Sequence, residues 1–393
     1  MKKLLVAAII SLSSISTAAL AEIKVGIILG FTGPIESLTP AMRDGARLAF
    51  LEASNSGNLL DGETFTILEA DSTCTDSAAA TAAADGLVAD GVVAIMGADC
   101  SGVTKAVNAA VAVPNGIIMV SPSATSPSLS SVPDNGTFWR TAPSDAKGGQ
   151  VLAQIALDRG ISEIAITYEN SDYGKGLSEV FAAAFESGGG VVTTNDPHEN
   201  GKGDYSAEVG VLASAGGDAL AVLGYLDQAG GAIVQGALDS GAFDLFVLGD
   251  GMIGQALADS IGSDLNGSFG SVPGSTSKGA GKFNELAASN GMDGTAPYVA
   301  QSYDAAALIA LAIQKGGAAD KKTILSNISR VANAPGIKIM AGQLSYGLQM
   351  LAAGNEINYE GATDVEFNAF GDAYGSFLEQ EVVDGSFVTT QQR

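Results

Sequence analysis

Short apolar runs separated by helix-length segments constrain this chain more than any other feature of its sequence. Residues 92–96 (VVAIM) and 117–120 (IIMV) are apolar at successive positions, which is typical of strands buried on both faces of a parallel sheet. The Ala- and Val-rich residues 103–113 between them are long enough for a helix that returns the chain to the next parallel strand. The pattern predicts an α/β fold.

This alternation occurs in two consecutive series, separated by a break at WRTAP (139–143). Two series predict two doubly wound, Rossmann-like lobes with a ligand cleft between them, because pockets form preferentially between domains. The expected strands are 22–29, 64–70, 92–96, 117–120, 163–168, 190–194, 219–223, 245–249, 269–272 and 375–383. The expected helices are 39–54, 77–89, 103–113, 148–159, 176–187, 206–215, 228–240, 299–315 and 321–332. Residues 335–367 have little periodicity.

The first 21 residues have the three parts of a secretory signal peptide. Lys2 and Lys3 precede the apolar residues 4–10, and small residues follow up to Ala21, which predicts cleavage after Ala21. No later run of about 18 apolar residues predicts a membrane span. We therefore expect an exported protein.

The composition is strongly acidic. The chain has 43 Asp and Glu against 19 Lys and Arg, a formal net charge of −24. An acidic surface repels nucleic acid and anionic lipid, so neither is an expected partner.

The sequence lacks the usual motifs of catalysis and cofactor binding. It has no P-loop, G-x-S-x-G or H-E-x-x-H motif and no Cys/His metal spacing, and the loop after its first strand (GFTGP, 30–34) lacks the G-x-G-x-x-G fingerprint, so no cofactor or metal is expected. The one histidine, His198, has polar neighbours and is expected in a solvated loop. S-x-x-K occurs at 144–147 and 275–278, but the motif is short and its usual companions are absent. An enzyme is therefore the less favoured interpretation.

The two cysteines, Cys74 and Cys100, are predicted to form a disulfide. Each follows an expected strand of the first lobe, and the loops after neighbouring strands lie close together. Disulfides persist in exported proteins, although two free thiols stay possible. A bridge over a loop of this length contributes about 3–4 kcal/mol to stability and would fix the loop that carries Ser101.

Small hydroxyl residues follow both apolar strands of the opening pattern. Ser101 follows the strand at 92–96, and Ser123, Ala124 and Thr125 follow the strand at 117–120. Loops at the carboxyl ends of parallel strands offer free N–H groups, so two such loops could hold one carboxylate. The alternative is that these residues are ordinary loop and cap residues.

Three residues stand at expected strand ends of the second lobe: Tyr173, Tyr225 and Asp250. A carboxylate at this place could pair with an ammonium group, and tyrosines offer apolar faces with a polar tip. Taken singly, Asp250 could instead cap a helix and the tyrosines could pack between lobes.

Several segments resemble the branched-chain amino acid (Leu/Ile/Val) binding proteins of bacterial ABC importers, which are type I periplasmic binding proteins. The resemblance covers essentially the whole mature chain. Its motifs are VGIILGFTGP, ADSTCTD, GADCSGVT, MVSPSATSP, FWRTAPSD, YENSDYGKGL, VLGYLDQAGGAIVQGALDSG, LGDGM and APYVAQSYDAA.

The resemblance implies a two-lobe clamp whose chain crosses between lobes near Ala142, Ser271 and Tyr374. The lobes would be 22–142 plus 272–374 and 143–271 plus 375–393. It places the ligand's α-carboxylate on Ser101, Ser123, Ala124 and Thr125. The α-ammonium falls on Asp250, with Tyr173 and Tyr225 closing over the ligand. The cysteine contexts also match the family's disulfide.

The sequence departs from the family at three places. Asp250 stands where the family has Glu, residues 35–40 lack the aromatic often found there, and 336–355 resembles an insertion. We expect a monomeric periplasmic receptor that hands an amino-acid-like solute to a membrane permease. A receptor for an amide, urea-like or carboxylate solute, a sensory binding protein and an exported hydrolase are the alternatives.

Overall fold

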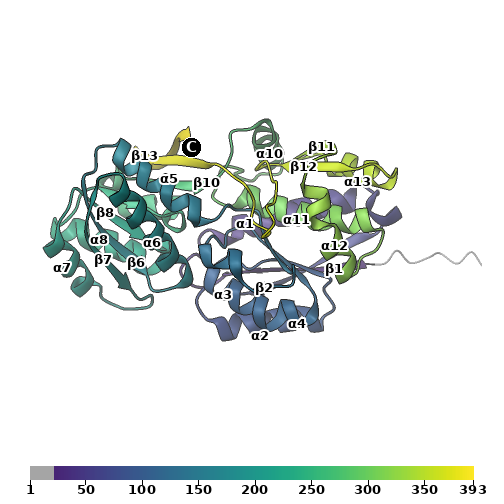
Figure 1. Cartoon of the computed structure of the whole chain (residues 1–393), viewed down its shortest axis with the longest axis horizontal. Coiled ribbons are helices and arrows are strands. Elements are labelled where there is room, and N and C mark those ends of the chain that lie inside the picture. The colour runs from purple at the N-terminus through teal and green to yellow at the C-terminus, as the bar shows by residue number, and fades with distance from the viewer. Residues whose placement is uncertain (1–21) are drawn as a thin grey trace, which may run out of the picture.

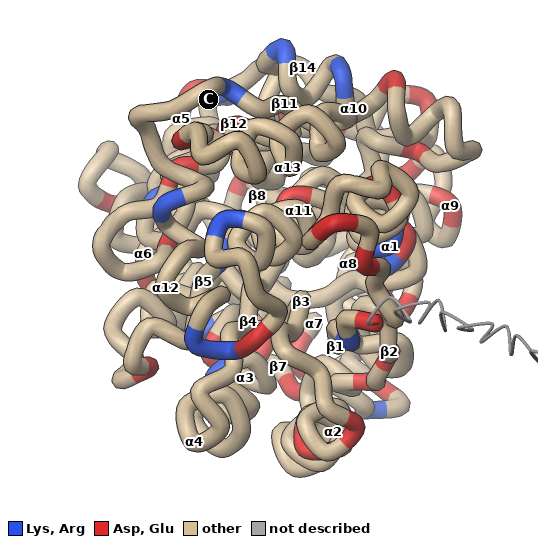
Figure 2. Tube along the Cα trace, turned by 90° about the vertical axis from the view of Figure 1, so that its right-hand side faces the viewer, with Lys and Arg blue, Asp and Glu red and all other residues tan. Residues whose placement is uncertain are grey.

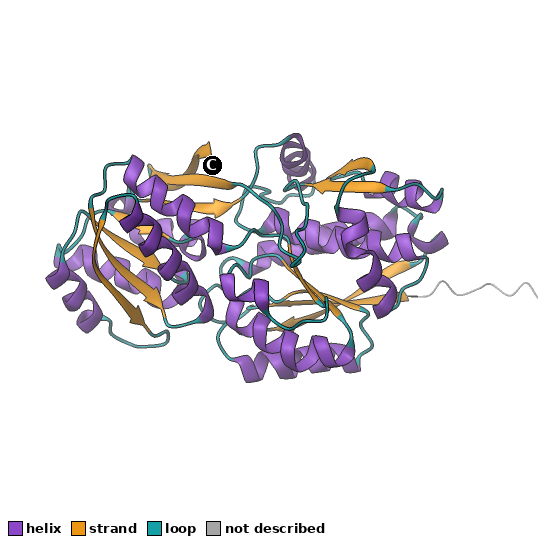
Figure 3. Cartoon of the chain, in the orientation of Figure 1, coloured by secondary structure: helices purple, strands orange, loops and turns teal. Residues whose placement is uncertain are grey.

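The computed structural model describes residues 22–393, which form two lobes side by side (Figure 1). Each lobe is built around a mainly parallel sheet with helices on both faces, as Figure 3 shows. The predicted doubly wound α/β architecture is confirmed. The predicted signal peptide, residues 1–21, lies outside the described residues. Within residues 22–393, no helix is both long and apolar enough to cross a bilayer.

The N-terminal lobe has a five-stranded sheet of order β2-β1-β3-β4-β5 in which all pairs are parallel. Its strands are β1 (Glu22–Leu29), β2 (Thr64–Asp71), β3 (Ala94–Gly97), β4 (Ile118–Ser121) and β5 (Phe138–Arg140). β3 and β4 are buried at every position because helices cover both faces of the sheet. One face carries α2 (Ser77–Ala89), α3 (Ser101–Val107) and α4 (Val113–Asn115); the other carries α1 (Thr39–Asn55), α11 (Val299–Gly316) and α12 (Lys321–Ala332) (Figure 1).

The helix expected at 103–113 is divided. α3 passes into a π-helical turn at Asn108–Ala112 and then into α4. Pro114 lies in the first turn of α4, and its ring removes one backbone N–H from the regular pattern.

The C-terminal lobe has a seven-stranded sheet of order β14-β13-β10-β9-β8-β6-β7. The strands β10, β9, β8, β6 and β7 are parallel to one another, whereas β13 and β14 are antiparallel to their neighbours. Its strands are β6 (Glu163–Glu169), β7 (Val191–His198), β8 (Ala219–Leu223), β9 (Phe246–Leu248), β10 (Phe269–Pro273), β13 (Phe377–Val383) and β14 (Ser386–Gln392). Its helices are α5 (Asp145–Asp158), α6 (Asp172–Ser187), α7 (Ser206–Ala215), α8 (Gly231–Ser240) and α9 (Gln255–Ile261).

The edge strand β14 is absent from the sequence prediction. Its side chains are almost all exposed, so no alternation of apolar residues marks it. Asp384 and Gly385 both have positive φ and form the two-residue turn that joins it to β13.

The weakly periodic residues 335–367 contain short elements. β11 (Ile337–Met340) pairs in parallel with β12 (Ile357–Gly361), and α13 (Leu344–Ala352) connects them. This unit packs with α10 (Lys278–Ser289) and α11 of the N-terminal lobe.

Three connections join the lobes: from β5 to α5, from β10 to α10, and from the segment after β12 to β13. Backbone hydrogen bonds tie the first and third of them together, since Arg140 N bonds Gly371 O and Ala373 N bonds Arg140 O.

Charged residues are spread over the molecule. In the view of Figure 2, acidic residues occur on many elements, including α1, α2 and α9, with basic residues between them. On this face the acidic excess does not gather into one patch.

Candidate functional site

A small closed cavity, of about 20 Å³, lies between the two lobes. Four of the seven predicted binding residues line it: Ser123, Tyr173, Tyr225 and Asp250. The remaining lining residues are Ile35, Leu38, Met42, Asp99, Cys100, Gly251 and Tyr298. Polar groups thus meet an apolar wall in one enclosed space.

The two hydroxyl-rich loops of the N-terminal lobe are joined to each other. Ser101 Oγ accepts a hydrogen bond from Ser126 N at 3.1 Å, and Ser123 Oγ donates to Asp99 O at 3.1 Å. Ala124 N donates to Ser121 Oγ at 3.0 Å. Ser101, Ala124 and Thr125 are buried behind the cavity wall, whereas Ser123 stands on it. These hydrogen bonds fix the loops, which is the alternative role that the sequence left open for these residues. They also hold Ser123 at the cavity.

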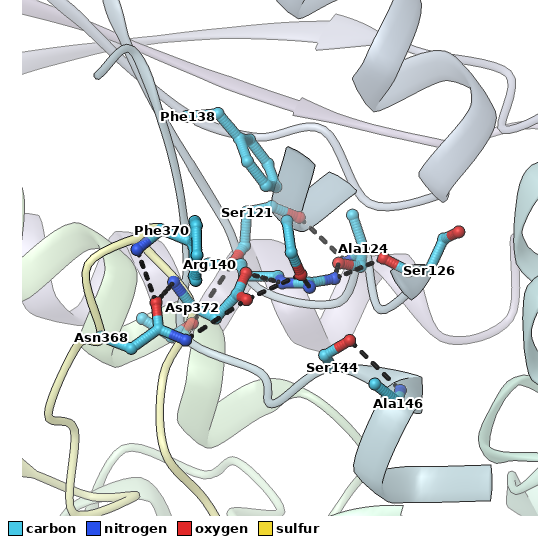
Figure 4. Close-up of polar contacts among 12 residues, drawn as sticks. Ser121, Ala124, Ser126, Phe138, Arg140, Ser144, Ala146, Asn368, Phe370 and Asp372 are labelled. Atoms are coloured by element: carbon cyan, nitrogen blue, oxygen red, sulfur yellow. Dashed lines mark hydrogen bonds and ion pairs between the residues drawn. The ribbon is translucent and has the colours of Figure 1, made fainter. Parts of the chain in front are cut away.

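Arg140 ties this loop to the connection before β13 (Figure 4). Its guanidinium is fully buried, and Nη1 donates to the carbonyl oxygens of Ala124 and Ser126 at 2.9 Å each. Nε pairs with Asp372 Oδ1 at 2.7 Å. Ser130 bonds both partners, since its hydroxyl accepts from Arg140 Nη2 and donates to Asp372 Oδ2. Together these contacts restrain the loop that carries Ala124 and Thr125.

The predicted disulfide between Cys74 and Cys100 is present, so that prediction is confirmed. Both residues are buried, and Cys100 lines the cavity directly before α3. The bridge ties the loop after β2 to the loop that carries Ser101.

Asp250 faces the cavity from the end of β9, with 7% of its surface exposed. Its Oδ1 accepts a hydrogen bond from the Tyr173 hydroxyl at 2.5 Å, and its Oδ2 accepts one from the Tyr298 hydroxyl. Burial raises the pKa of Asp250, and the two tyrosine hydroxyls oppose this by donating to its charged form. Because Tyr173 belongs to the C-terminal lobe and Tyr298 precedes α11, the carboxylate is held from both lobes.

Tyr173 and Tyr225 stack with ring centroids 5.0 Å apart and planes 15° apart. The helix expected at 176–187 begins four residues earlier, at Asp172, so Tyr173 lies in α6 and not in the loop before it. Ser171 caps the helix by accepting a hydrogen bond from Gly174 N at 3.2 Å.

His198 is not a solvated loop residue as we expected. It ends β7, is 1% exposed, and its Nδ1 lies 2.9 Å from Thr167 Oγ1. Burial lowers the pKa of His198 to about 4, so the ring is neutral at pH 7. The residues before it in β7 are exposed or half-buried, so no apolar pattern marks the buried position.

Sequence reasoning missed several residues of this region, notably Tyr298 and Asp145. Tyr298 lies within the APYVAQSYDAA motif and has a positive φ of 63°, a strained conformation of the kind found at ligand sites. Asp145 directly follows Ser144, the first residue of the S-x-x-K tetrad at 144–147. Ser144 is instead the cap of α5, since its Oγ accepts from Ala146 N at 3.2 Å. Ser277, in the second such tetrad, caps α10.

Comparisons with known proteins agree with the fold. A family model described as "Periplasmic binding protein" matches residues 22–344. Leu/Ile/Val-binding protein homolog 3 of Brucella melitensis is 30% identical over 238 residues, which cover 60% of this chain and 63% of the relative. The chain thus aligns with less than two thirds of that relative's length.

Solved structures share the fold. The leucine binding protein LivK of Thermotoga maritima has a TM-score of 0.77 at 23% identity, covering 94% of this chain and 98% of that one. A solute binding protein of R. palustris in complex with benzoate has a TM-score of 0.76 at 15% identity, covering 95% and 96%.

Proposed function

The chain belongs to the periplasmic binding protein family, and from this premise we propose that it captures an α-amino acid between its lobes and delivers it to the membrane permease of an ABC transporter. The matching family model and relatives are binding proteins, so an enzyme is not the favoured interpretation. The family is periplasmic. Cleavage of a signal peptide after Ala21 and a monomeric receptor are parts of the proposal.

One observation carries the proposal: a buried carboxylate, Asp250, faces the hydroxyl-rich loops of the other lobe across an enclosed cavity. An α-amino acid presents a cation and an anion on one carbon atom. We assign the ammonium group to Asp250, and the carboxylate to Ser101, Ser123, Ala124 and Thr125. Tyr173 and Tyr225 cover the bound solute with their stacked rings.

The side-chain end of the site is apolar. Ile35, Leu38 and Met42 form an apolar part of the cavity wall on the N-terminal lobe. A wall of this kind favours an aliphatic side chain, as in the relatives that are named for leucine, isoleucine and valine.

Closure of the lobes is the proposed signal to the permease. We assign the moving units to 22–142 plus 272–374 and to 143–271 plus 375–393. Contacts across the cleft hold the closed form: Lys105 Nζ pairs with Asp172 Oδ1 at 3.0 Å, and Ser37 N donates to Asp227 Oδ2 at 2.8 Å. Such contacts form only when the lobes close. Because the solute is held by residues of both lobes, its binding shifts the population toward this closed form.

A thermal-shift panel on residues 22–393 tests the function. The panel holds the twenty amino acids, small amides, ureas and short or aromatic carboxylates, each at millimolar concentration. A ligand at about 100 times its Kd stabilises the folded protein by about 2.7 kcal/mol, and we expect this rise in Tm with aliphatic amino acids. A response to carboxylates or amides alone would reassign the solute class, and conversion of the ligand during incubation would point to an enzyme.

A further inference from the structure

Asp145 is a buried acid without a matching partner. Only 2% of its surface is exposed, and within residues 22–393 its Oδ2 accepts no hydrogen bond of normal geometry. An ionised carboxylate in such a place is costly unless a cation or several donors face it. The side chain therefore has unused capacity to accept a hydrogen bond.

The neighbours of Asp145 belong to the ligand site. Its backbone N donates to Thr125 O at 2.9 Å, and the fully buried Thr125 Oγ1 also lacks a partner of normal geometry. The Thr125 hydroxyl is nevertheless near enough to lower the pKa of Asp145. Two unused polar groups thus lie together, one from the binding loop and one from the first turn of α5.

The charges around Asp145 leave it uncompensated. Burial and the charge of Asp250 raise its pKa well above the usual range, while Thr125 and Arg140 lower it only in part. The donors of Arg140 are already engaged by Asp372, Ser130 and the carbonyls of the binding loop. The other titratable groups within reach are the hydroxyls of Tyr173, Tyr225 and Tyr298, which are acids as well.

We propose that Asp145 is a positioning residue of the ligand site: its carboxylate accepts a hydrogen bond from the Thr125 hydroxyl, which turns the lone pairs of that oxygen toward the ammonium group held by Asp250. This inference rests on the proposed amino-acid function. The ammonium then donates to Asp250 and to the Thr125 hydroxyl, which leaves the backbone N–H of Thr125 for the solute's carboxylate. The Asp145 carboxylate lies directly behind that hydroxyl. The site therefore selects solutes with a primary ammonium group over acids of the same shape that lack one.

Pairs of amino acids and their deaminated analogues test this selection: L-leucine with 4-methylpentanoate, L-phenylalanine with 3-phenylpropanoate and L-alanine with propanoate. Affinities are measured by calorimetry in two buffers of different ionisation enthalpy, which also counts the protons released. In the wild type, the arriving cation favours the charged form of Asp145, so we expect binding to release protons. For Asp145→Asn we expect amino acid affinity to fall about tenfold, selectivity over the deaminated analogue to fall equally, and fewer protons to be released.

Two further variants separate positioning from structure. Ser144→Ala removes the cap of α5 and should lower Tm without changing selectivity or proton release. Thr125→Val is nearly isosteric and should reduce selectivity as Asp145→Asn does, and it carries the test if Asp145→Asn does not fold. In the Asp145→Asn/Thr125→Val double variant, the combined fold-loss of selectivity should be smaller than the product of the two single losses, because both substitutions break the same hydrogen bond.

The outcomes are distinguishable. Unchanged selectivity and proton release in Asp145→Asn, or losses that simply multiply in the double variant, overturn the inference while the proposed function stands. If the wild type binds none of the amino acids, the proposed function fails and the inference fails with it.

Discussion

Two clusters in this molecule each join a buried aspartate to tyrosine hydroxyls, but they differ in completeness, that is, in how many hydrogen-bond donors the aspartate has. In the N-terminal lobe, the fully buried Asp304 accepts hydrogen bonds from the Tyr359 hydroxyl at 2.8 Å and from Ala362 N at 2.9 Å. Thr363 adds its N at 2.9 Å and its Oγ1 at 2.7 Å. Burial raises the pKa of Asp304 to about 6, and all of these donors oppose the shift.

The cluster at the cleft is built with fewer donors and from two lobes. Asp250 is held by Tyr173 on one side and Tyr298 on the other, and the nearby Asp145 has an oxygen without a partner. A carboxylate saturated inside one lobe stabilises that lobe. A carboxylate with spare capacity between lobes is suited to a ligand, so the difference separates a structural acid from a functional one.

The largest effect should come from Asp304→Ala. Removing the carboxylate leaves four donor groups of Tyr359, Ala362 and Thr363 without their acceptor, and we expect the free energy of unfolding to fall by about 4 kcal/mol. Urea unfolding measures this loss. Amino acid affinity of the folded fraction should stay within about threefold of the wild type, and a selective loss of affinity would contradict the structural role.

Asp250→Ala should have the opposite profile. Amino acid affinity should fall about 100-fold, or about 3 kcal/mol, because the ammonium group loses its charged partner. The Tm without ligand should change little, since the variant also removes the cost of burying a charge. Calorimetry and thermal unfolding measure the two values, and affinity equal to the wild type would show that the ammonium assignment is wrong.

A third buried acid, Glu169, extends the comparison to the pH dependence of stability. Burial raises its pKa to about 8, and one of its oxygens has no partner within the described chain. The folded protein therefore binds a proton that the unfolded chain releases near pH 4.5, so stability should fall as pH rises from about 4.5 to about 8.

Glu169→Gln should remove most of that loss and be more stable than the wild type at pH 8.5. The acid side should stay as it is, because the pKa of His198 is lowered to about 4 and its cost appears only below pH 6.5. The midpoints of urea unfolding across pH 4–9 measure both the loss of stability as the pH rises and the loss below pH 6.5. Parallel pH curves for the variant and the wild type would contradict the assignment.

Much of the fold could be predicted because its signals are local. The bounds of α2, α7, β8 and α12 are those expected, and Asp76 and Asp320 cap α2 and α12 with their side chains. The cysteine pair also followed from local order, since each residue comes three positions after a strand of one sheet, and β1 alone lies between those two strands.

The rest depends on contacts that join distant parts of the chain. Tyr298 reaches Asp250 across 48 sequence positions and from the other lobe, and neither residue marks the other in the sequence. Asp145 occupies an ordinary helix-start position, where an acid normally favours the helix dipole, so its missing partner is visible only in three dimensions. His198 was misplaced because its buried position follows a polar row on the same strand.

The smallest expected effect comes from a matched pair of tyrosines. Tyr298→Phe removes the hydroxyl that Asp250 receives from the N-terminal lobe, and it should weaken amino acid binding about fivefold, or about 1 kcal/mol. Tyr359→Phe removes the corresponding hydroxyl from Asp304 and should lower stability by a similar amount without affecting binding. Both changes delete one oxygen from a buried ring. If the two variants gave the same profile, completeness of the cluster would not distinguish a structural acid from one that serves a ligand.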